Sequence, residues 1–176
     1  MKKIKSFKVD HTKIVPGMYI SRIDDDITTY DIRMVKPNAG VYLENDGLHT
    51  FEHLFATYVR NSEFENNIIY VGPMGCRTGF YLVVRNIAND DAINLVLNSM
   101  KFIENFKGEI PGATEIECGN YKEHNLQKAN SYAEENKMTA FKVNSDYVRV
   151  CDINGNEYET KTNNGIFNCP VSADPI

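Results

Sequence analysis

Three kinds of segment are missing from the sequence, and each absence argues against a class of protein. No apolar run reaches the roughly eighteen residues of a membrane-spanning helix, and Met1-Lys2-Lys3-Ile4-Lys5 is not followed by the apolar segment of a secretion signal. No basic stripe occurs either, because the net charge is -5 and both signs are mixed along the chain. We therefore expect a cytoplasmic protein with no nucleic-acid and no membrane partner.

Cysteine is scarce, and its placement excludes a disulfide-rich scaffold. The four cysteines, Cys76, Cys118, Cys151 and Cys169, form no Cys-x-x-Cys pair. In a reducing cytosol, scattered cysteines are more often buried, metal-binding or catalytic than bridged. Cys151 and Cys169 follow strand-like residues, so we expect them to be packed thiols.

The composition that is present is typical of one soluble globular domain: 176 residues, of which 42% are hydrophobic and 24% charged. Alternating residues bounded by turn signals predict strands over residues 3–9, 18–23, 28–35, 68–71 and 80–87. Helix signals cover about 46–62, 89–107 and 120–137. The predicted fold class is α+β, a mainly antiparallel sheet with helices packed on one face, plus a β-rich C-terminal tail.

The segment His49-Thr50-Phe51-Glu52-His53 carries the strongest chemical signal. On a helix, its two histidines and its glutamate lie within about 100° of arc and share one face, while Phe51 and Leu54 project from the other side. Two imidazoles supply two nitrogen ligands, and a catalytic metal site also needs a third protein ligand and an open position. The pentapeptide therefore predicts a metal enzyme without specifying which one.

Two downstream residues are candidates for the third ligand. Cys118 would complete a site of two histidines and a thiolate. The order His-x-x-Glu-His is also the signature of inverzincin peptidases, in which the carboxylate is the base and a later glutamate binds the metal. Glu123 lies at a suitable distance for that role. From the residues alone, both hypotheses stay open.

Cys76 lies in a second unusual segment, Gly72-Pro73-Met74-Gly75-Cys76-Arg77-Thr78-Gly79, between two predicted strands. A lone cysteine is more often a buried small side chain. Here the neighbouring cation Arg77 and the amides of a glycine-rich loop favour the thiolate. We therefore interpret Cys76 as a reactive residue.

Five separated blocks carry a more specific pattern: Ser6-Phe7 with Asp10-His11-Thr12; Asp31-Ile32-Arg33 with Pro37-Asn38; Gly47-Leu48-His49-Thr50-Phe51-Glu52-His53-Leu54; Pro73-Met74-Gly75-Cys76-Arg77-Thr78-Gly79-Phe80-Tyr81; and Ile110-Pro111 with Cys118-Gly119-Asn120-Tyr121. Together, over about residues 3–137, they resemble the LuxS family, the S-ribosylhomocysteine lyases. We take residues 1–137 as a LuxS-like metal-dependent lyase domain and residues 138–176 as a β-rich C-terminal extension packed on the same domain.

The resemblance implies a complete active site. His49, His53 and Cys118 would hold one divalent metal, preferably Fe(II), with Zn or Co possible and water as the fourth ligand. The resemblance makes Glu52 and Cys76 the catalytic acid and base groups. It assigns Ser6, His11 and Arg33 to substrate binding, and it implies a homodimer with active sites at the interface.

The implied reaction cleaves the thioether of S-ribosylhomocysteine to homocysteine and 4,5-dihydroxy-2,3-pentanedione, the autoinducer-2 precursor used in quorum sensing. Two proton shuttles can move a sugar carbonyl along the chain when a metal polarises it. Proton removal next to the sulfur-bearing carbon then expels the thiolate, so the bond breaks by elimination.

Two features differ from the family pattern. Tyr70 stands where the family typically has an aspartate six residues before the loop cysteine, and the tail from about Met138 is β-rich where the family usually ends in its helix. These differences leave a non-catalytic LuxS-like binding protein as a further alternative. His124 is expected beside the metal ligands or in solvent.

Overall fold

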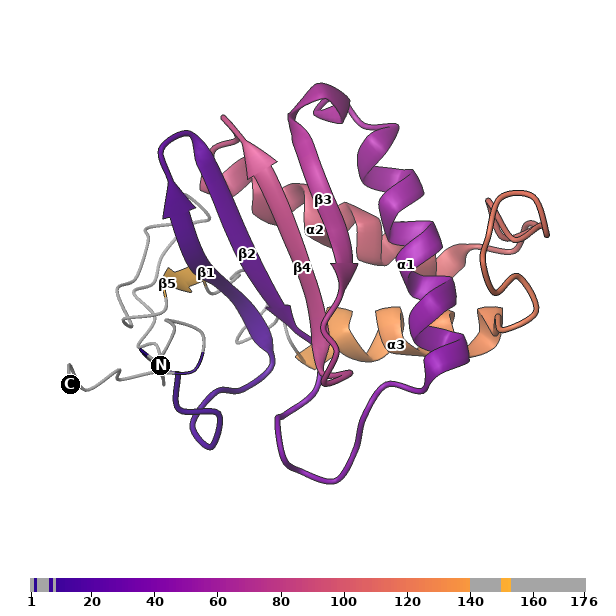
Figure 1. The fold of residues 1–176 in the computed structure, drawn as a ribbon, viewed down its shortest axis with the longest axis horizontal. Helices are drawn as coiled ribbons and strands as arrows, with labels where there is room; N and C mark the ends of the chain where they lie inside the picture. Colours follow the sequence, from indigo (N-terminus) through magenta and orange to yellow (C-terminus); the bar gives the residue numbers. More distant parts are fainter. Residues whose placement is uncertain (1, 3–6, 8, 140–149, 153–176) are drawn as a thin grey trace.

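The computed structural model describes residues 2, 7, 9–139 and 150–152. Their strands form one sheet with the order β3-β4-β2-β1-β5 (Figure 1). Strands β3, β4, β2 and β1 pair antiparallel with one another, and the edge strand β5 pairs in parallel with β1. The strands are β1 (Gly17–Asp24), β2 (Ile27–Arg33), β3 (Ile68–Pro73), β4 (Gly79–Arg85) and β5 (Val150–Asp152).

Three helices cover one face of this sheet, which confirms the predicted α+β fold class (Figure 1). They are α1 (Asn45–Arg60), α2 (Asn89–Asn105) and α3 (Leu126–Thr139), and a short 3-10 helix, η2 (Glu65–Asn67), precedes β3. Among the described residues, no helix is long and apolar enough to cross a membrane.

An aromatic cluster joins α1 to the sheet. The rings of Phe51 and Phe55 on α1 pack against Phe80 on β4, with centroids 4.8 and 6.2 Å from it, and all three side chains are buried. Burying each such side chain contributes about 1.5–3 kcal/mol. Because these residues occupy the sheet-facing side of α1, the helix presents its opposite side, which includes His49 and His53, to the segment that follows α2.

Two elements differ from the sequence prediction. Phe7 and Val9, the described residues of the first predicted strand, are not in a strand. Helix α3 begins at Leu126 instead of near residue 120, because Asn125 caps it: its side-chain oxygen accepts a hydrogen bond from the Lys128 amide at 3.0 Å. In the predicted β-rich tail, the structure describes β5, and residues 140–149 and 153–176 lie outside the described part.

Gly79 is required where β4 meets β2. A Cβ atom at this position would lie 2.1 Å from the Ile32 carbonyl oxygen, which is backbone and cannot move aside cheaply. We expect Gly79→Ala to lower the free energy of unfolding by about 1–3 kcal/mol, as overpacking does. Gly75→Ala is the matched control, since a Cβ there meets nothing within 4 Å. Urea unfolding checks the pair, and equal effects of the two substitutions would contradict this account.

Candidate active site

Helix α1 places two imidazoles side by side on its outer flank. The rings of His49 and His53 lie 4.7 Å apart between centroids and are nearly perpendicular, at 87°. Glu52 lies between them in sequence and is likewise partly exposed. The predicted helical face is therefore present, and it is held rigidly because the other face of α1 is buried in the core.

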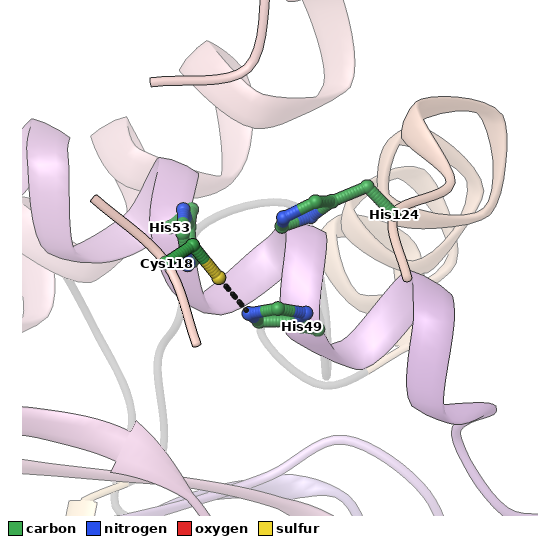
Figure 2. A group of neighbouring side chains, drawn as sticks. All are labelled: His49, His53, Cys118 and His124. Carbon is green, nitrogen blue, oxygen red and sulfur yellow. Dashed lines mark hydrogen bonds between the residues drawn. The ribbon is translucent and has the colours of Figure 1, made fainter. Parts of the chain in front are cut away.

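The segment between α2 and α3 brings two more candidate ligands to this flank. One ligand atom from each of His49, His53, Cys118 and His124 lies within 4.8 Å of all the others. Figure 2 shows the Cys118 sulfur facing the His49 ring, with its Sγ 3.4 Å from Nε2. The Asn120 amide donates to the same sulfur at 3.4 Å, which stabilises negative charge there. The structure thus brings together all three predicted metal ligands.

Backbone carbonyls orient both α1 histidines. Nδ1 of His49 lies 2.9 Å from the Glu123 carbonyl oxygen, and Nδ1 of His53 lies 2.8 Å from the Pro111 carbonyl oxygen. Since a carbonyl only accepts, each Nδ1 must carry the proton, which leaves Nε2 as an acceptor whose lone pair can bind a proton or a metal. Metal-binding histidines in proteins are held by this kind of hydrogen bond.

The donor set fits a divalent transition metal. Two imidazole nitrogens and one thiolate are ligands that zinc, cobalt and iron accept, whereas calcium and magnesium prefer oxygen. Burial, and then the charges of His49 and His53, lower the pKa of His124 to about 4. His124 is therefore neutral near pH 7 and adds no positive charge that would repel a cation.

Glu123 does not join this cluster. Its carboxylate accepts a hydrogen bond from the Asn120 side chain, and its backbone carbonyl is the group that holds His49. The ligand that the metallopeptidase hypothesis requires is therefore directed elsewhere, and Cys118 occupies the place of the third ligand.

Cys76 lies at a different place, in the tight turn between β3 and β4. Its side chain is exposed, and its sulfur lies 3.0 Å from Thr78 Oγ1 and 3.8 Å from Nη1 of Arg33. The turn is closed by the Arg77 amide bonding the Met74 carbonyl at 2.8 Å, with Arg77 in the left-handed conformation at a φ of 58°.

Arg33 is buried, with 3% of its surface exposed. It donates two hydrogen bonds to Asp31 and one to Thr78. These bonds fix the guanidinium group so that its Nη1 lies beside the Cys76 sulfur. Burial alone would lower the pKa of Arg33, but the charge and hydrogen bonds of Asp31, with a smaller effect of Cys76, raise it above its usual value. Arg33 therefore stays charged, and in this structure it supports Cys76. Its predicted contact with substrate stays a prediction.

This arrangement predicts a large stability effect at Arg33. Arg33→Met leaves Asp31 buried without its partner, and we expect a loss of about 3–5 kcal/mol in the free energy of unfolding. Arg22→Met is the matched control, because Arg22 pairs with Asp24 on the surface, where both side chains are at least 44% exposed and such pairs contribute less than about 1 kcal/mol. Chemical denaturation measures both. A loss no larger than the Arg22→Met loss would show that the Asp31–Arg33 pair is not structural.

The remaining predicted substrate residues are less constrained. His11 has its Nδ1 3.0 Å from the Val9 carbonyl oxygen, which leaves Nε2 available to another group. Ser6 lies outside the described residues.

Comparison with known proteins identifies the family. The model of the family described as S-Ribosylhomocysteinase (LuxS) matches residues 4–151. The chain belongs to the LuxS family. Three relatives, each named S-ribosylhomocysteine lyase, come from Finegoldia magna, Borreliella afzelii and Clostridium acetobutylicum. The Finegoldia magna protein is 45% identical over 138 residues, which cover 76% of this chain and 88% of the relative. The Borreliella afzelii protein is 51% identical over 135 residues, which cover 73% and 86% of the two chains. The Clostridium acetobutylicum protein is 46% identical over 136 residues, which cover 74% and 86%.

The LuxS relationship confirms the family that the sequence motifs indicated. Sequence reasoning did not assign roles to Asp31 or Thr78, which hold Arg33, and it placed His124 only approximately. Asp31 and Arg33 lie two residues apart on β2, and this spacing is a signal that could have identified their pair. No spacing signal identifies Thr78 or His124, because their contacts join β2 to the β3–β4 turn and α1 to the segment before α3.

Proposed function

We propose that this chain is a metal-dependent lyase that cleaves S-ribosylhomocysteine to homocysteine and 4,5-dihydroxy-2,3-pentanedione, the autoinducer-2 precursor. The observation that carries the proposal is the meeting of His49, His53 and Cys118 at one point in a LuxS-family chain. A role in quorum sensing and a cytoplasmic location are part of the same proposal.

The metal is one divalent ion per chain, with Fe(II) the preferred candidate and Zn or Co as alternatives. When bound, such an ion polarises a sugar carbonyl and makes the neighbouring C–H acidic. His49, His53 and Cys118 are three protein ligands, which leaves an open position for substrate. The backbone carbonyls of Glu123 and Pro111 keep both Nε2 lone pairs free for this purpose.

Glu52 and Cys76 move the protons. One removes a proton from the neighbour of the carbonyl carbon on the sulfur side, which gives an enediol. The other returns a proton to the former carbonyl carbon while the hydroxyl proton moves between the two oxygens, so the carbonyl shifts one carbon toward the sulfur. In the last step a proton leaves the carbon next to the sulfur-bearing carbon. The freed electron pair forms the new double bond, the C–S bond breaks, and homocysteine leaves as the thiolate. No oxidant or reductant is consumed.

In a homodimer, Glu52 of one chain and Cys76 of the other can reach the same substrate molecule. Figure 1 places the β3–β4 turn, which carries Cys76, and residues 106–125, which carry Cys118, on opposite flanks of α1. In the proposed homodimer, Cys76 and Arg33 of one chain face the metal ligands of the other, and His11 and Ser6 stay proposed substrate-binding residues. This arrangement supports active sites at the subunit interface.

Thiol release tests the proposed function. Purified protein loaded anaerobically with metal is incubated with S-ribosylhomocysteine, and the free thiol is titrated over time. We expect release that stops on chelation, returns on reloading, and falls to background in Glu52→Ala. Absence of release above the Glu52→Ala background would reject the lyase and favour a non-catalytic LuxS-like binding protein.

A further inference from the structure

His124 occupies an unusual position beside the three predicted ligands. Its ring is stacked on that of His49, with centroids 4.1 Å apart and planes at 24°, and it meets His53 edge-on at 4.8 Å. Its Nε2 is buried and has no hydrogen-bond partner in the described part of the chain. A buried polar atom of this kind requires a partner, and the surrounding residues indicate which kind.

Hydrogen bonds around Thr50 determine which ring nitrogen of His124 carries the proton. The Thr50 hydroxyl donates its one hydrogen to the Asp46 carbonyl at 2.9 Å, and it accepts the Asn125 amide at 2.8 Å. It lies 3.1 Å from Nδ1 of His124 and has no second hydrogen to give. Nδ1 must therefore be the donor, so Nε2 is an unprotonated acceptor within the cluster.

Ring orientation separates His124 from the metal ligands. An imidazole binds a metal along the lone pair in its own plane, at about 2.0–2.1 Å. The perpendicular rings of His49 and His53 can direct their lone pairs at one ion, whereas the nearly parallel rings of His49 and His124 direct theirs side by side. Figure 2 shows the His124 ring lying over the ring of His49, the histidine that the Cys118 sulfur faces.

We infer that His124 is not a ligand but a hydrogen-bond acceptor, whose Nε2 binds the hydroxyl of an oxygen ligand at the open position of the metal centre. The inference rests on the proposed function. The ligand class is an α-hydroxy ketone, which offers a carbonyl oxygen and a neighbouring hydroxyl. His124 is then a positioning residue that distinguishes a hydroxyl-bearing ligand from one without a donor.

A matched pair of small ligands tests this assignment without turnover. Hydroxyacetone carries the hydroxyl, and methoxyacetone has the same carbonyl but no donor. Their binding to Co(II)-loaded protein is followed by the visible absorption of the cobalt. We expect the parent to prefer hydroxyacetone. In His124→Leu, the ratio of the two affinities is expected to fall about tenfold, the effect of one hydrogen bond. His124→Gln keeps an acceptor and is expected to retain most of the preference. Both variants should keep one cobalt per chain and the thiolate-to-cobalt absorption.

Several results would overturn the assignment. If the parent shows no preference, or if His124→Leu keeps it, no hydrogen bond runs from the bound hydroxyl to His124. Loss of cobalt from His124→Leu at concentrations that saturate the parent would identify His124 as a fourth ligand. If the preference behaves as expected and S-ribosylhomocysteine still releases no thiol, only the proposed function fails. Normal thiol release with an unchanged preference in His124→Leu would overturn only this inference.

Discussion

Cys76→Ala is expected to reduce thiol release from S-ribosylhomocysteine roughly 10⁴-fold, the upper range for loss of an acid–base group. Cys76 is exposed, and its sulfur is 3.8 Å from the guanidinium of the buried Arg33, so it is accessible to a substrate proton. Alanine removes the proton carrier and leaves the Asp31–Arg33 pair in place. The rate is measured by thiol titration with the metal-loaded variant.

Two controls separate chemistry from folding. The metal content and unfolding midpoint of Cys76→Ala should match the parent, because the sulfur is exposed and lies apart from the cluster of His49, His53 and Cys118. Cys76→Ser keeps a side chain of similar size, but its hydroxyl ionises far less readily, so we expect it to be nearly as inactive. A Cys76→Ala variant with more than a tenth of the parent rate would rule out a catalytic role for this thiol.

Cys118→Ala is expected to weaken metal binding more than 100-fold, beyond the roughly 10–100-fold cost of losing a hydrogen-bonded supporting group. The sulfur is 3.4 Å from Nε2 of His49 and is the one thiolate of the cluster. Its loss leaves two imidazoles, too few protein ligands for a stable catalytic site. Competition with a chromophoric chelator measures the affinity.

Glu123→Gln is the matched variant for this experiment. The inverzincin-like hypothesis makes Glu123 the third ligand, whereas in the structure its carboxylate bonds Asn120 and only its backbone carbonyl supports His49. We expect Glu123→Gln to keep parent affinity within a few-fold. The reverse pattern, with metal lost from Glu123→Gln and kept by Cys118→Ala, would support the inverzincin-like hypothesis for the metal ligands.

The helix with His49 and His53 could be predicted from sequence because its signal is local. Apolar residues at helical spacing determine which side of α1 is buried, and the histidines occupy the other side. The start of α3 was placed too early for an equally local reason. Residues 120–125 are polar and helix-compatible in composition, but the side chain of Asn125 caps the helix at Leu126.

Other parts of the site depend on contacts between distant segments. From the residues alone Cys118 was one of two candidate ligands beside Glu123, and the family resemblance was needed to choose it, since nothing in its own surroundings indicates His49 as its partner. The resemblance assigns Arg33 to substrate binding, and in the structure its guanidinium also bonds Asp31, two residues earlier on β2, and the distant Thr78. The acceptor state of His124 depends on Thr50, which lies 74 positions away in the chain. Which ring nitrogen of such a histidine carries the proton can be inferred only from its contacts in the folded protein.

Product analysis tests the central claim, elimination after carbonyl migration, most directly. S-ribosylhomocysteine is incubated with metal-loaded protein, the thiol is titrated, and the five-carbon product is trapped with 1,2-diaminobenzene, which condenses with vicinal diketones to a quinoxaline. We predict one quinoxaline for each thiol, and neither product after chelation or in Glu52→Ala. Thiol accompanied by unchanged ribose would mean that the thioether is cleaved by hydrolysis, and this outcome would contradict the proposed mechanism.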